Sequence, residues 1–335
     1  MESESQHIIT LNGLSIGYPS KEPLVIQGDA SLHPGEIVAL AGRNGAGKST
    51  LLKCINGLQR PLEGDIRIYQ KVLPDLTVKE KAKILAFVSA GKTYTENITV
   101  KELVSMGRYP YTNWWGSMAQ TDTGVIRDAL RFAGMRALSD TGISELSDGE
   151  FQRAMIARAL AQDTPLLILD EPTAFLDIPN RYEILNVLTA MKEQGKSILF
   201  STHDIETASR FADRFWVIHN RQLIEGGTED LGLQGVFKNL FADQNLMFDP
   251  QSMKYAPAVT PKKKIGLSGP GNDSLTWTKK ALERIGCEVH MDVEKENLNC
   301  TVVRESGAYY WILGENESTH RFPNIHQMVK YLTRM

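Results

Sequence analysis

The chain has 335 residues, of which 42% are hydrophobic and 23% are charged, and its formal net charge is -3. These values predict a globular protein of about two domains and give no whole-chain basic signature of a nucleic-acid-binding protein. Three scattered cysteines without C-x-x-C spacing suggest neither a disulfide framework nor a zinc site, so we expect a reducing, cytoplasmic setting. No apolar run approaches the roughly 20 residues of a membrane span, so any membrane association should be peripheral.

The N-terminal part of the chain is predicted to form short strands that lead to a glycine-rich loop. Strands are predicted at Ile8–Tyr18, around Leu24–Ile26 and at Ile37–Leu40, and the last of these is apolar throughout. It leads into residues 42–49, Gly-Arg-Asn-Gly-Ala-Gly-Lys-Ser, which match the pattern G-x-x-x-x-G-K-S/T between a strand and a helix. A glycine-rich turn without a ligand is the alternative, but the full match in this setting predicts a nucleoside triphosphate site.

The residue types of this loop suit the chemistry of a triphosphate. Glycines let consecutive backbone N–H groups approach the phosphate oxygens, and the following helix adds its positive N-terminal end. We expect Lys48 to reach the β- and γ-phosphates and the Ser49 hydroxyl to bind Mg²⁺. The predicted cofactors are therefore ATP and Mg²⁺. The predicted nucleotide contacts in this loop are Asn44, Gly45, Ala46, Gly47, Lys48, Ser49 and Thr50.

A helical insert is predicted at about residues 95–160, after strands near 65–69 and 84–88. Apolar residues recur at spacings of three and four, as at Val100, Leu103 and Val104. A long amphipathic helix then follows Leu146–Glu150. The pattern predicts a separate helical subdomain.

Two carboxylates follow the next strand, Leu166–Leu169, which is apolar on both faces and should lie in the middle of a parallel sheet. Asp170 and Glu171 then lie at the carboxyl edge of that sheet, where the phosphate loop also lies. One carboxylate can bind Mg²⁺, which we assign to Asp170 together with Ser49, and the other can orient or deprotonate the attacking water. A solvated strand end is the less favoured interpretation.

The composition changes near the C-terminal part of the chain. We expect a first domain at residues 1–245, a proline- and lysine-containing linker at 246–263, and a small α/β or α+β domain at 264–335. The glycine-rich turn at 266–272 could bind an anion, but a Gly/Pro connector is the favoured interpretation. Regulation of the first domain and added dimer contact both remain open as roles for the small domain.

Together these motifs make residues 8–230 resemble the nucleotide-binding subunits of ABC transporters. Leu146–Glu150 is similar to the LSGGQ signature, Phe175–Asp177 to the D-loop, and Ser201–Asp204 to the strand end that carries the switch histidine. Tyr18 takes the place of the aromatic residue on which adenine stacks. The resemblance implies an α/β P-loop ABC ATPase with a core mixed sheet and a helical subdomain.

The resemblance also implies a mechanism. A second copy of the chain would place the Ser147 hydroxyl and the Gly149 N–H on the γ-phosphate, and Asp177 of the D-loop is expected to be a further nucleotide-binding residue. Lys48, Glu171 and His203 would be the catalytic residues, and His203 would hold the water together with Glu171. Integral membrane permease subunits, and indirectly a solute-binding protein, would be the other partners, so the chain would lie at the cytoplasmic face of the inner membrane.

Two positions depart from the family pattern. Asp148 and Glu150 replace the usual Gly and Gln of the signature, whereas Ser147 and Gly149 are kept. Ala90 stands where the family has a glutamine that binds Mg²⁺ and water, and Ala90 has no coordinating atom in its side chain. Either Thr93 or a water molecule would have to replace that glutamine.

The insert resembles one class of importer. Thr99–Pro110 is similar to the segment V-x-E-L-V-x-x-G-R-x-P of ATPases that serve iron-siderophore, haem and cobalamin importers. In that class the segment lies near the groove for a cytoplasmic helix of the membrane subunit. Tyr111, Trp114 and Trp115 would be aromatic anchors there, with plain core packing as the alternative for the tryptophans.

Three alternatives to an importer ATPase are a soluble ABC protein, a regulatory module and an exporter. A soluble ABC protein of translation or DNA repair is disfavoured, because the chain has one phosphate loop and no sustained heptads. A regulatory module with vestigial hydrolysis is motivated by Ala90 and the altered signature. An exporter is less favoured, because the insert resembles importers.

Overall fold

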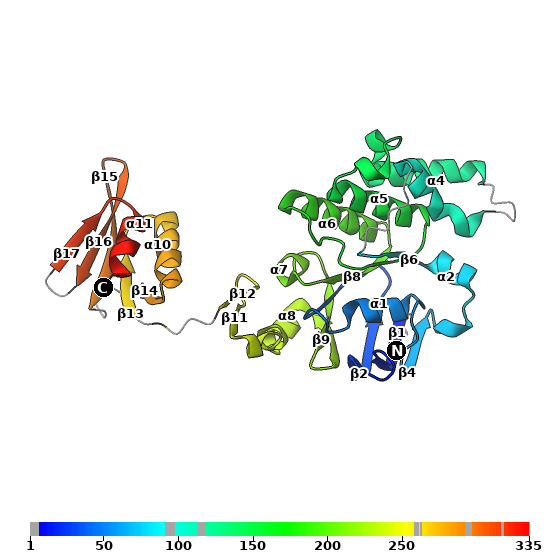
Figure 1. Ribbon diagram of the computed structural model, residues 1–335, viewed down its shortest axis with the longest axis horizontal. Helices are drawn as coiled ribbons and strands as arrows, with labels where there is room; N and C mark the ends of the chain where they lie inside the picture. Colours follow the sequence, from blue (N-terminus) through cyan, green and yellow to red (C-terminus); the bar gives the residue numbers. More distant parts are fainter. Residues whose placement is uncertain are drawn as a thin grey trace, which may run out of the picture. The chain divides into compact units, whose positions relative to one another are not determined.

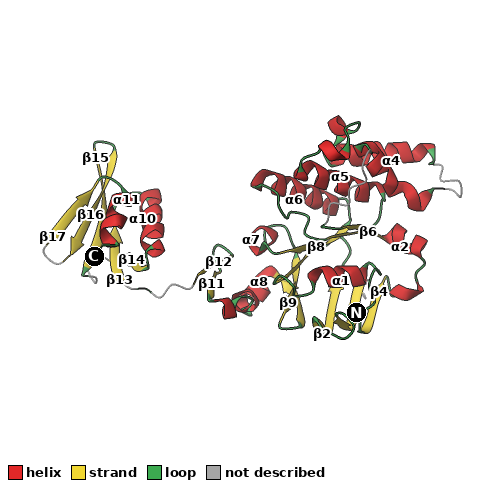
Figure 2. Cartoon of the chain, in the orientation of Figure 1, coloured by secondary structure: helices red, strands yellow, loops and turns green. Residues whose placement is uncertain are grey.

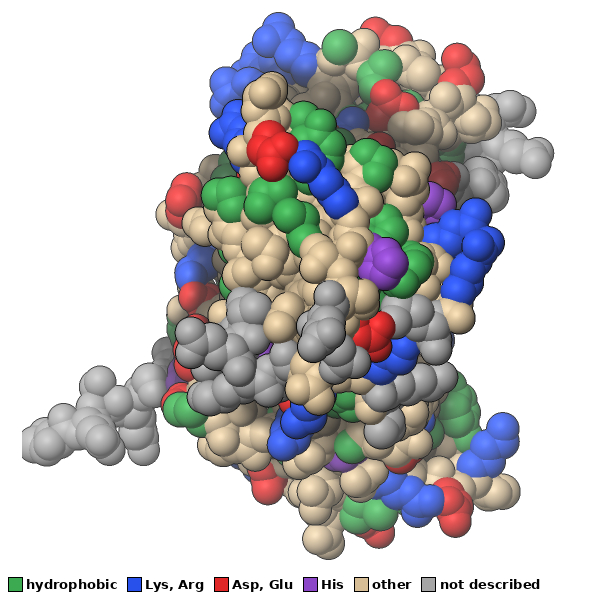
Figure 3. All heavy atoms as spheres, turned by 90° about the vertical axis from the view of Figure 1, so that its left-hand side faces the viewer, with side chains coloured by type: hydrophobic (Ala, Val, Ile, Leu, Met, Phe, Trp, Pro, Cys, Tyr) green, Lys and Arg blue, Asp and Glu red, His purple; other side chains and the backbone are tan. Residues whose placement is uncertain are grey.

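The computed structural model describes residues 7–90, 98–112, 118–257, 261, 263–291, 297–315 and 318–334. The chain divides into two compact units, Met1–Ala256 and Pro257–Met335. Among the helices of the described ranges, none combines the length and the apolar character that crossing a bilayer requires. On the face shown in Figure 3, Lys and Arg side chains are interspersed with Asp and Glu side chains, as the small net charge leads one to expect.

The N-terminal unit contains two sheets. An antiparallel sheet has the strand order β2-β1-β4-β5, and a second sheet has the order β10-β9-β3-β8-β7-β6. The second sheet is parallel except for β10, which pairs antiparallel with β9, so the expected mixed sheet is present. Their strands are β1 (Ile9–Ile16), β2 (Val25–Leu32), β3 (Ile37–Gly42), β4 (Glu63–Ile68), β5 (Lys71–Val72), β6 (Leu85–Val88), β7 (Leu166–Leu169), β8 (Ser197–Thr202), β9 (Arg214–His219) and β10 (Gln222–Gly227).

The helices of this unit pack in separate layers. Helix α1 lies between the two sheets, and α4, α5 and α6 lie beyond the parallel sheet (Figure 1). Strands β3, β7 and β8 are buried along their whole length, because both of their faces are covered. The helices are α1 (Lys48–Ile55), α2 (Val78–Ile84), α3 (Val100–Ser105), α4 (Gln120–Phe132), α5 (Asp148–Ala161), α6 (Ile178–Glu193), α7 (Ile205–Ala208), α8 (Thr228–Leu233) and α9 (Val236–Asn239).

The alternation of side chains along β3 explains this layering. Val38 and Leu40 point into the core around α1, whereas Ile37, Ala39 and Ala41 point into the core shared with α5 and α6. Successive side chains of a strand face opposite sides, so one apolar strand can join two cores. The strand that precedes the phosphate loop is therefore fixed from both sides.

The structure corrects the predicted linker at 246–263. Its first part forms a hairpin of β11 (Leu246–Asp249) and β12 (Lys254–Pro257), which packs on the N-terminal unit. Phe248 and Tyr255 contact the rings of Phe237 and Phe241, and the Tyr255 hydroxyl donates to the Phe237 carbonyl at 2.6 Å. Aromatic burial therefore outweighs the proline signal, since Pro250 lies in the hairpin turn and Pro257 at a strand end.

The C-terminal unit is a mixed sheet with two helices against one face (Figure 2). Its order is β14-β13-β15-β16-β17, with parallel pairing around β13 and antiparallel pairing from β15 to β17. Trp311 lies in its core and donates its indole N–H to Thr278 at 2.7 Å. Its elements are β13 (Lys263–Ser268), α10 (Asn272–Arg284), β14 (Cys287–His290), β15 (Leu298–Glu305), β16 (Ala308–Glu315), β17 (Ser318–Phe322) and α11 (Ile325–Leu332).

Candidate nucleotide-binding and hydrolysis site

The phosphate loop connects β3 to α1, as the motif predicts. Gly47 is the N-cap of α1 and has a φ of 112°, a conformation that favours glycine, and a Cβ there would lie 3.0 Å from the Leu24 Cβ. The Lys48 ammonium donates to the carbonyls of Gly42 at 3.0 Å and Arg43 at 3.4 Å. The lysine side chain therefore folds back over its own loop.

Burial lowers the pKa of Lys48, whereas the carboxylates of Glu171 and Asp170 oppose that shift. Only 5% of the residue is exposed, and its Nζ lies 3.8 Å from the Glu171 Oε1. A buried ammonium with incomplete compensation favours an anionic ligand, because a triphosphate would replace the lost hydration of the charge.

Asp170 is the centre of a hydrogen-bond network that joins three sequence motifs. Its Oδ1 accepts from the Ser49 hydroxyl at 3.1 Å and from the Ser201 hydroxyl at 2.7 Å, and the residue is 6% exposed. Ser201 also accepts the Glu171 N–H at 2.8 Å. The predicted metal ligands Ser49 and Asp170 are thus brought together, and hydroxyl and carboxylate oxygens are ligands that suit Mg²⁺.

The sequence indicates Ser201 only as part of the segment Ser201–Asp204 that carries His203 at a strand end. Its role follows from the parallel pairing of β7 with β8, in which Leu169 lies opposite Phe200. The residues that follow, Asp170 and Ser201, are consequently neighbours at the same sheet edge. A serine directly after a buried apolar run was the available signal.

Glu171 and His203 also meet at this edge. The Glu171 Oε2 lies 3.3 Å from the His203 Nδ1, and the Glu171 side chain is 25% exposed. Asp204 caps α7 and accepts from the Arg181 guanidinium at 2.6 Å, so the residue next to His203 is anchored. Lys48, Glu171 and His203, the three predicted catalytic residues, therefore form one cluster.

The signature residues lie at the start of α5. Ser147 caps that helix: its hydroxyl donates to the Glu150 Oε2 at 2.7 Å, and its N–H donates to the same oxygen at 2.9 Å. A Cβ at Gly149 would lie 2.7 Å from the Asn180 Cγ, so α5 packs closely against the Asn180 side chain of α6 at this position. Among the described residues, neither Ser147 nor Gly149 makes a hydrogen bond to the phosphate loop.

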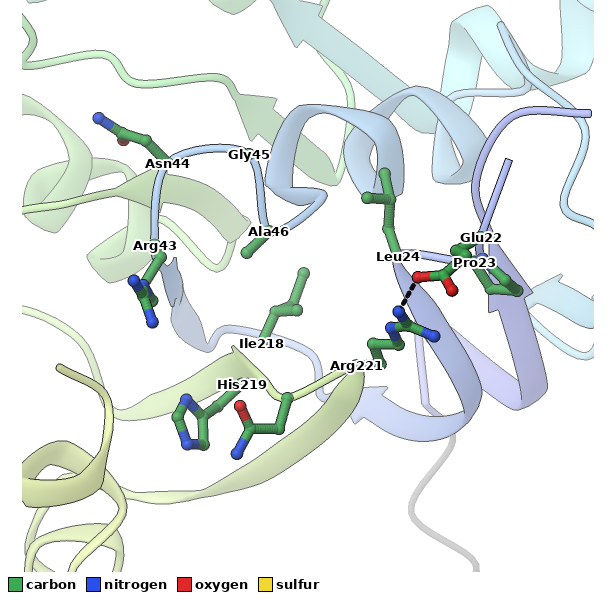
Figure 4. Close-up of a pocket in the computed structure, with 11 residues that line it drawn as sticks. Glu22, Pro23, Leu24, Arg43, Asn44, Gly45, Ala46, Ile218, His219 and Arg221 are labelled. Carbon is green, nitrogen blue, oxygen red and sulfur yellow. Dashed lines mark hydrogen bonds and ion pairs between the residues drawn. The ribbon is translucent and has the colours of Figure 1, made fainter. Parts of the chain in front are cut away.

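The remaining predicted nucleotide contacts have different environments. Tyr18 is 46% exposed, so its ring is accessible for stacking, whereas Thr50 is buried at the start of α1. Asp177 caps α6 by accepting the Asn180 N–H at 3.1 Å. The other loop residues Asn44, Gly45 and Ala46 line a cavity of about 400 Å³ (Figure 4). Their contacts with a nucleotide remain predictions.

The motif that resembles importer ATPases has a structural part and an exposed part. Arg108 is buried and donates to the Asp122 Oδ1 at 2.8 Å, and a Cβ at Gly107 would lie 2.2 Å from the Arg158 carbonyl oxygen. Tyr109, in contrast, is 63% exposed. Ala90 is exposed after β6, whereas Thr93, Trp114 and Trp115 lie outside the described residues.

The ABC transporter family model matches residues 27–174, and the iron ABC transporter C-terminal domain model matches residues 262–333. The achromobactin transport ATP-binding protein CbrD of Dickeya dadantii is 37% identical over 245 residues, which are 72% of this chain and 91% of that protein.

Two further relatives extend the comparison. The iron(3+)-hydroxamate import ATP-binding protein FhuC of Bacillus subtilis is 36% identical over 72% of this chain and 90% of its own length. A dimeric post-hydrolysis structure of the ATP-binding cassette MJ0796, bound to ADP and Pi, has a TM-score of 0.58 at 27% identity, and covers 65% of this chain and 98% of that one. These relatives show that the chain belongs to the family of ATP-binding subunits of ABC transporters.

Proposed function

We propose that the chain binds and hydrolyses ATP to energise an importer of ferric siderophores or of related metal chelates such as haem or cobalamin. The observation that carries the proposal is the network around Asp170, in which three motifs distant in sequence converge beside Lys48, Glu171 and His203. Such a network would hold the Lys48 ammonium close to the phosphates and the Asp170 carboxylate close to their Mg²⁺. The substrate class is inferred from relatives that transport achromobactin and iron(3+)-hydroxamate, and from the iron-transporter C-terminal domain match.

The residues of this chain would divide the hydrolysis between them. Lys48 donates to the β- and γ-phosphate oxygens, Glu171 accepts a hydrogen bond from the attacking water and takes its proton, and His203 donates to the γ-phosphate. Ser49 and Asp170 would hold Mg²⁺, which when bound neutralises charge that develops on the phosphates.

A second copy would complete the site. Ser147 and the Gly149 N–H lie at a helix N-terminus, which suits a phosphate, yet they make no hydrogen bond to the phosphate loop of their own copy. Two copies arranged head to tail would each cover the other's ATP. The dimeric state of the related cassette supports this arrangement. Membrane permease subunits at the cytoplasmic face would transmit the closure to the transport path.

The test is a Glu171→Gln variant, measured alone and with the membrane partner. Because the carboxylate would be replaced by a neutral amide of the same shape, ATP hydrolysis should fall at least about 100-fold while ATP binding is retained. ATP should then trap a dimer, detected by light scattering.

Two outcomes would contradict the proposal. Unchanged hydrolysis in Glu171→Gln would remove Glu171 from the mechanism. If the variant never pairs in the presence of ATP and the membrane partner, the sandwich is wrong. Uptake of ferric siderophore, haem and cobalamin with the reconstituted partner would identify the solute.

A further inference from the structure

The Arg43 side chain of the phosphate loop forms an ion pair with a residue near the C-terminal end of the N-terminal unit. Figure 4 shows Arg43 and Asn44 leaving the loop in opposite directions. The Arg43 Nη1 lies 2.8 Å from the Oδ1 and 2.7 Å from the Oδ2 of Asp243. The hydrogen bond from Arg43 is the main cause that lowers the pKa of Asp243, so the carboxylate is ionised.

The backbone of Arg43 contributes to the shape of the loop. Its carbonyl accepts the Ala46 N–H at 3.1 Å, which closes the turn, and it accepts the Lys48 ammonium at 3.4 Å. A contact that restrains the Arg43 side chain therefore also restrains the carbonyl that positions Lys48. The contact therefore favours the loop conformation seen here, in which the Arg43 carbonyl accepts from Lys48.

Asp243 belongs to a segment with a second contact near the site. We call residues 236–257 the connector: it contains α9, the short helix Ala242–Gln244 and the hairpin β11-β12, and the chain continues from it into the C-terminal unit. At its other end the Lys254 Nζ lies 3.2 Å from the Glu206 Oε2 in α7, three residues after His203. The connector thus touches both the phosphate-loop side and the switch-histidine side.

We propose that Asp243 is a positioning residue of the phosphate loop: it acts through Arg43 and links the ATP site to the connector. The inference rests on the proposed function, because it assigns a regulator to the same ATP site. The ion pair is partly exposed, with side-chain exposures of 33% for Arg43 and 65% for Asp243, so it contributes little to folding stability. Its effect is expected in ATP affinity.

The test is an Asp243→Ala variant of the full chain, with Asp128→Ala as the matched control. Asp128 also forms an exposed pair with an arginine, Arg131, at 3.4 Å on α4, and has no place in the proposed ATP site. Both variants should unfold at nearly the wild-type temperature. For Asp243→Ala, the KM for ATP and the Kd of a fluorescent ATP analogue should rise about two- to fivefold with kcat unchanged, as for loss of an exposed ion pair.

Two further measurements separate positioning from a general change of charge. Asp243→Glu should restore most of the affinity, because it keeps the carboxylate, whereas Asp243→Asn should not. High salt should narrow the difference between wild type and Asp243→Ala, since exposed pairs are screened.

Three outcomes would overturn the inference. An unchanged KM, or an equal change in Asp128→Ala, would show that the contact does not position the loop. A lower KM in Asp243→Ala would show that Asp243 only repels the triphosphate. A wild-type protein that binds no ATP would instead contradict the proposed function itself, so the two failures can be told apart.

Discussion

The two halves of the proposed ATP sandwich differ in how their polar groups are already bonded within one chain. On the phosphate-loop side, Ser49 and Ser201 donate to the carboxylate of Asp170, so the bonds join residues far apart in sequence. On the signature side, Ser147 bonds only locally, to Glu150 in the first turn of the same helix. The hydrogen bonds of the phosphate-loop side therefore depend on the tertiary fold. On the signature side, Ser147 is hydrogen-bonded within its own helix, and a bound phosphate would have to replace that bond.

That local bond has an electrostatic consequence. The side-chain and backbone hydrogen bonds from Ser147 lower the pKa of Glu150, so a negative charge lies at the N-terminus that should receive the γ-phosphate. A carboxylate there offsets the positive end of the helix dipole. The comparison therefore predicts strong binding of ATP by a single copy and weak closure of the second copy over it.

The largest expected effect separates the two halves directly. Lys48→Ala should weaken ATP binding to a single copy about 100-fold, because charge-assisted hydrogen bonds to the phosphates are lost. Ser147→Ala should leave that binding within about twofold, yet abolish ATP-driven pairing. Fluorescent nucleotide titration measures the first quantity and light scattering the second.

Thr99→Ala is the control for Ser147→Ala. Thr99 caps α3 through the same kind of reciprocal bond, to Glu102. Either substitution should therefore lower stability by about 1 kcal/mol, whereas only Ser147→Ala should affect pairing. Equal loss of pairing in both variants would mean that helix stability, and not the signature, controls closure.

A smaller effect is expected for Ser201→Ala, which breaks the network on the phosphate-loop side. The Asp170 carboxylate and the Glu171 N–H would each lose a buried partner, so kcat should fall roughly 10-fold and the Mg²⁺ requirement should rise. Ser197→Ala is the matched control, because Ser197 is equally buried on β8 and accepts the Gly35 N–H at 2.7 Å. Equal losses of activity in both variants would argue against a specific role for Ser201.

The smallest effect is expected on the signature side, at Glu150. Glu150→Gln removes the charge and keeps a side chain that can still accept from Ser147, so less ATP should be needed to form the dimer, by about two- to fivefold. Glu102→Gln is the control, since Glu102 occupies the same position in the α3 cap. If Glu150→Gln pairs no more readily than wild type, the carboxylate does not limit closure.

The sequence alone predicted the parts of the site that are carried by short contiguous motifs. Residues 42–49, the pair Asp170 and Glu171, and His203 each follow an apolar strand, and parallel strands bring their ends to one edge. Ser201 also follows an apolar run, but its hydrogen-bond partners, like that of Asp243, could not be assigned from such a motif. The first depends on the pairing register of β7 and β8, and the second on a contact with Arg43 across 200 positions of sequence.

The fold was predicted with similar limits. The helical insert and a small α/β or α+β C-terminal domain could be expected from periodicity, whereas the mixed sheet could be expected only from the family resemblance. The β11-β12 hairpin could not, since each of its strands is four residues long and prolines lie in its turn and at one strand end. Its stability comes from aromatic contacts with Phe237 and Phe241, which no local pattern reveals.

The backbone conformation of Glu171 lowers the stability of the fold, whereas the proposed mechanism needs the Glu171 side chain. Glu171 has a φ of 48°, in the left-handed region that a non-glycine residue adopts at a cost of about 1 to 3 kcal/mol. Glycine would relieve that cost and remove the carboxylate that we propose as the base, so selection for heat resistance alone would oppose the proposed hydrolysis at this position. A library that is screened for thermostable variants of this protein should therefore leave residue 171 unchanged.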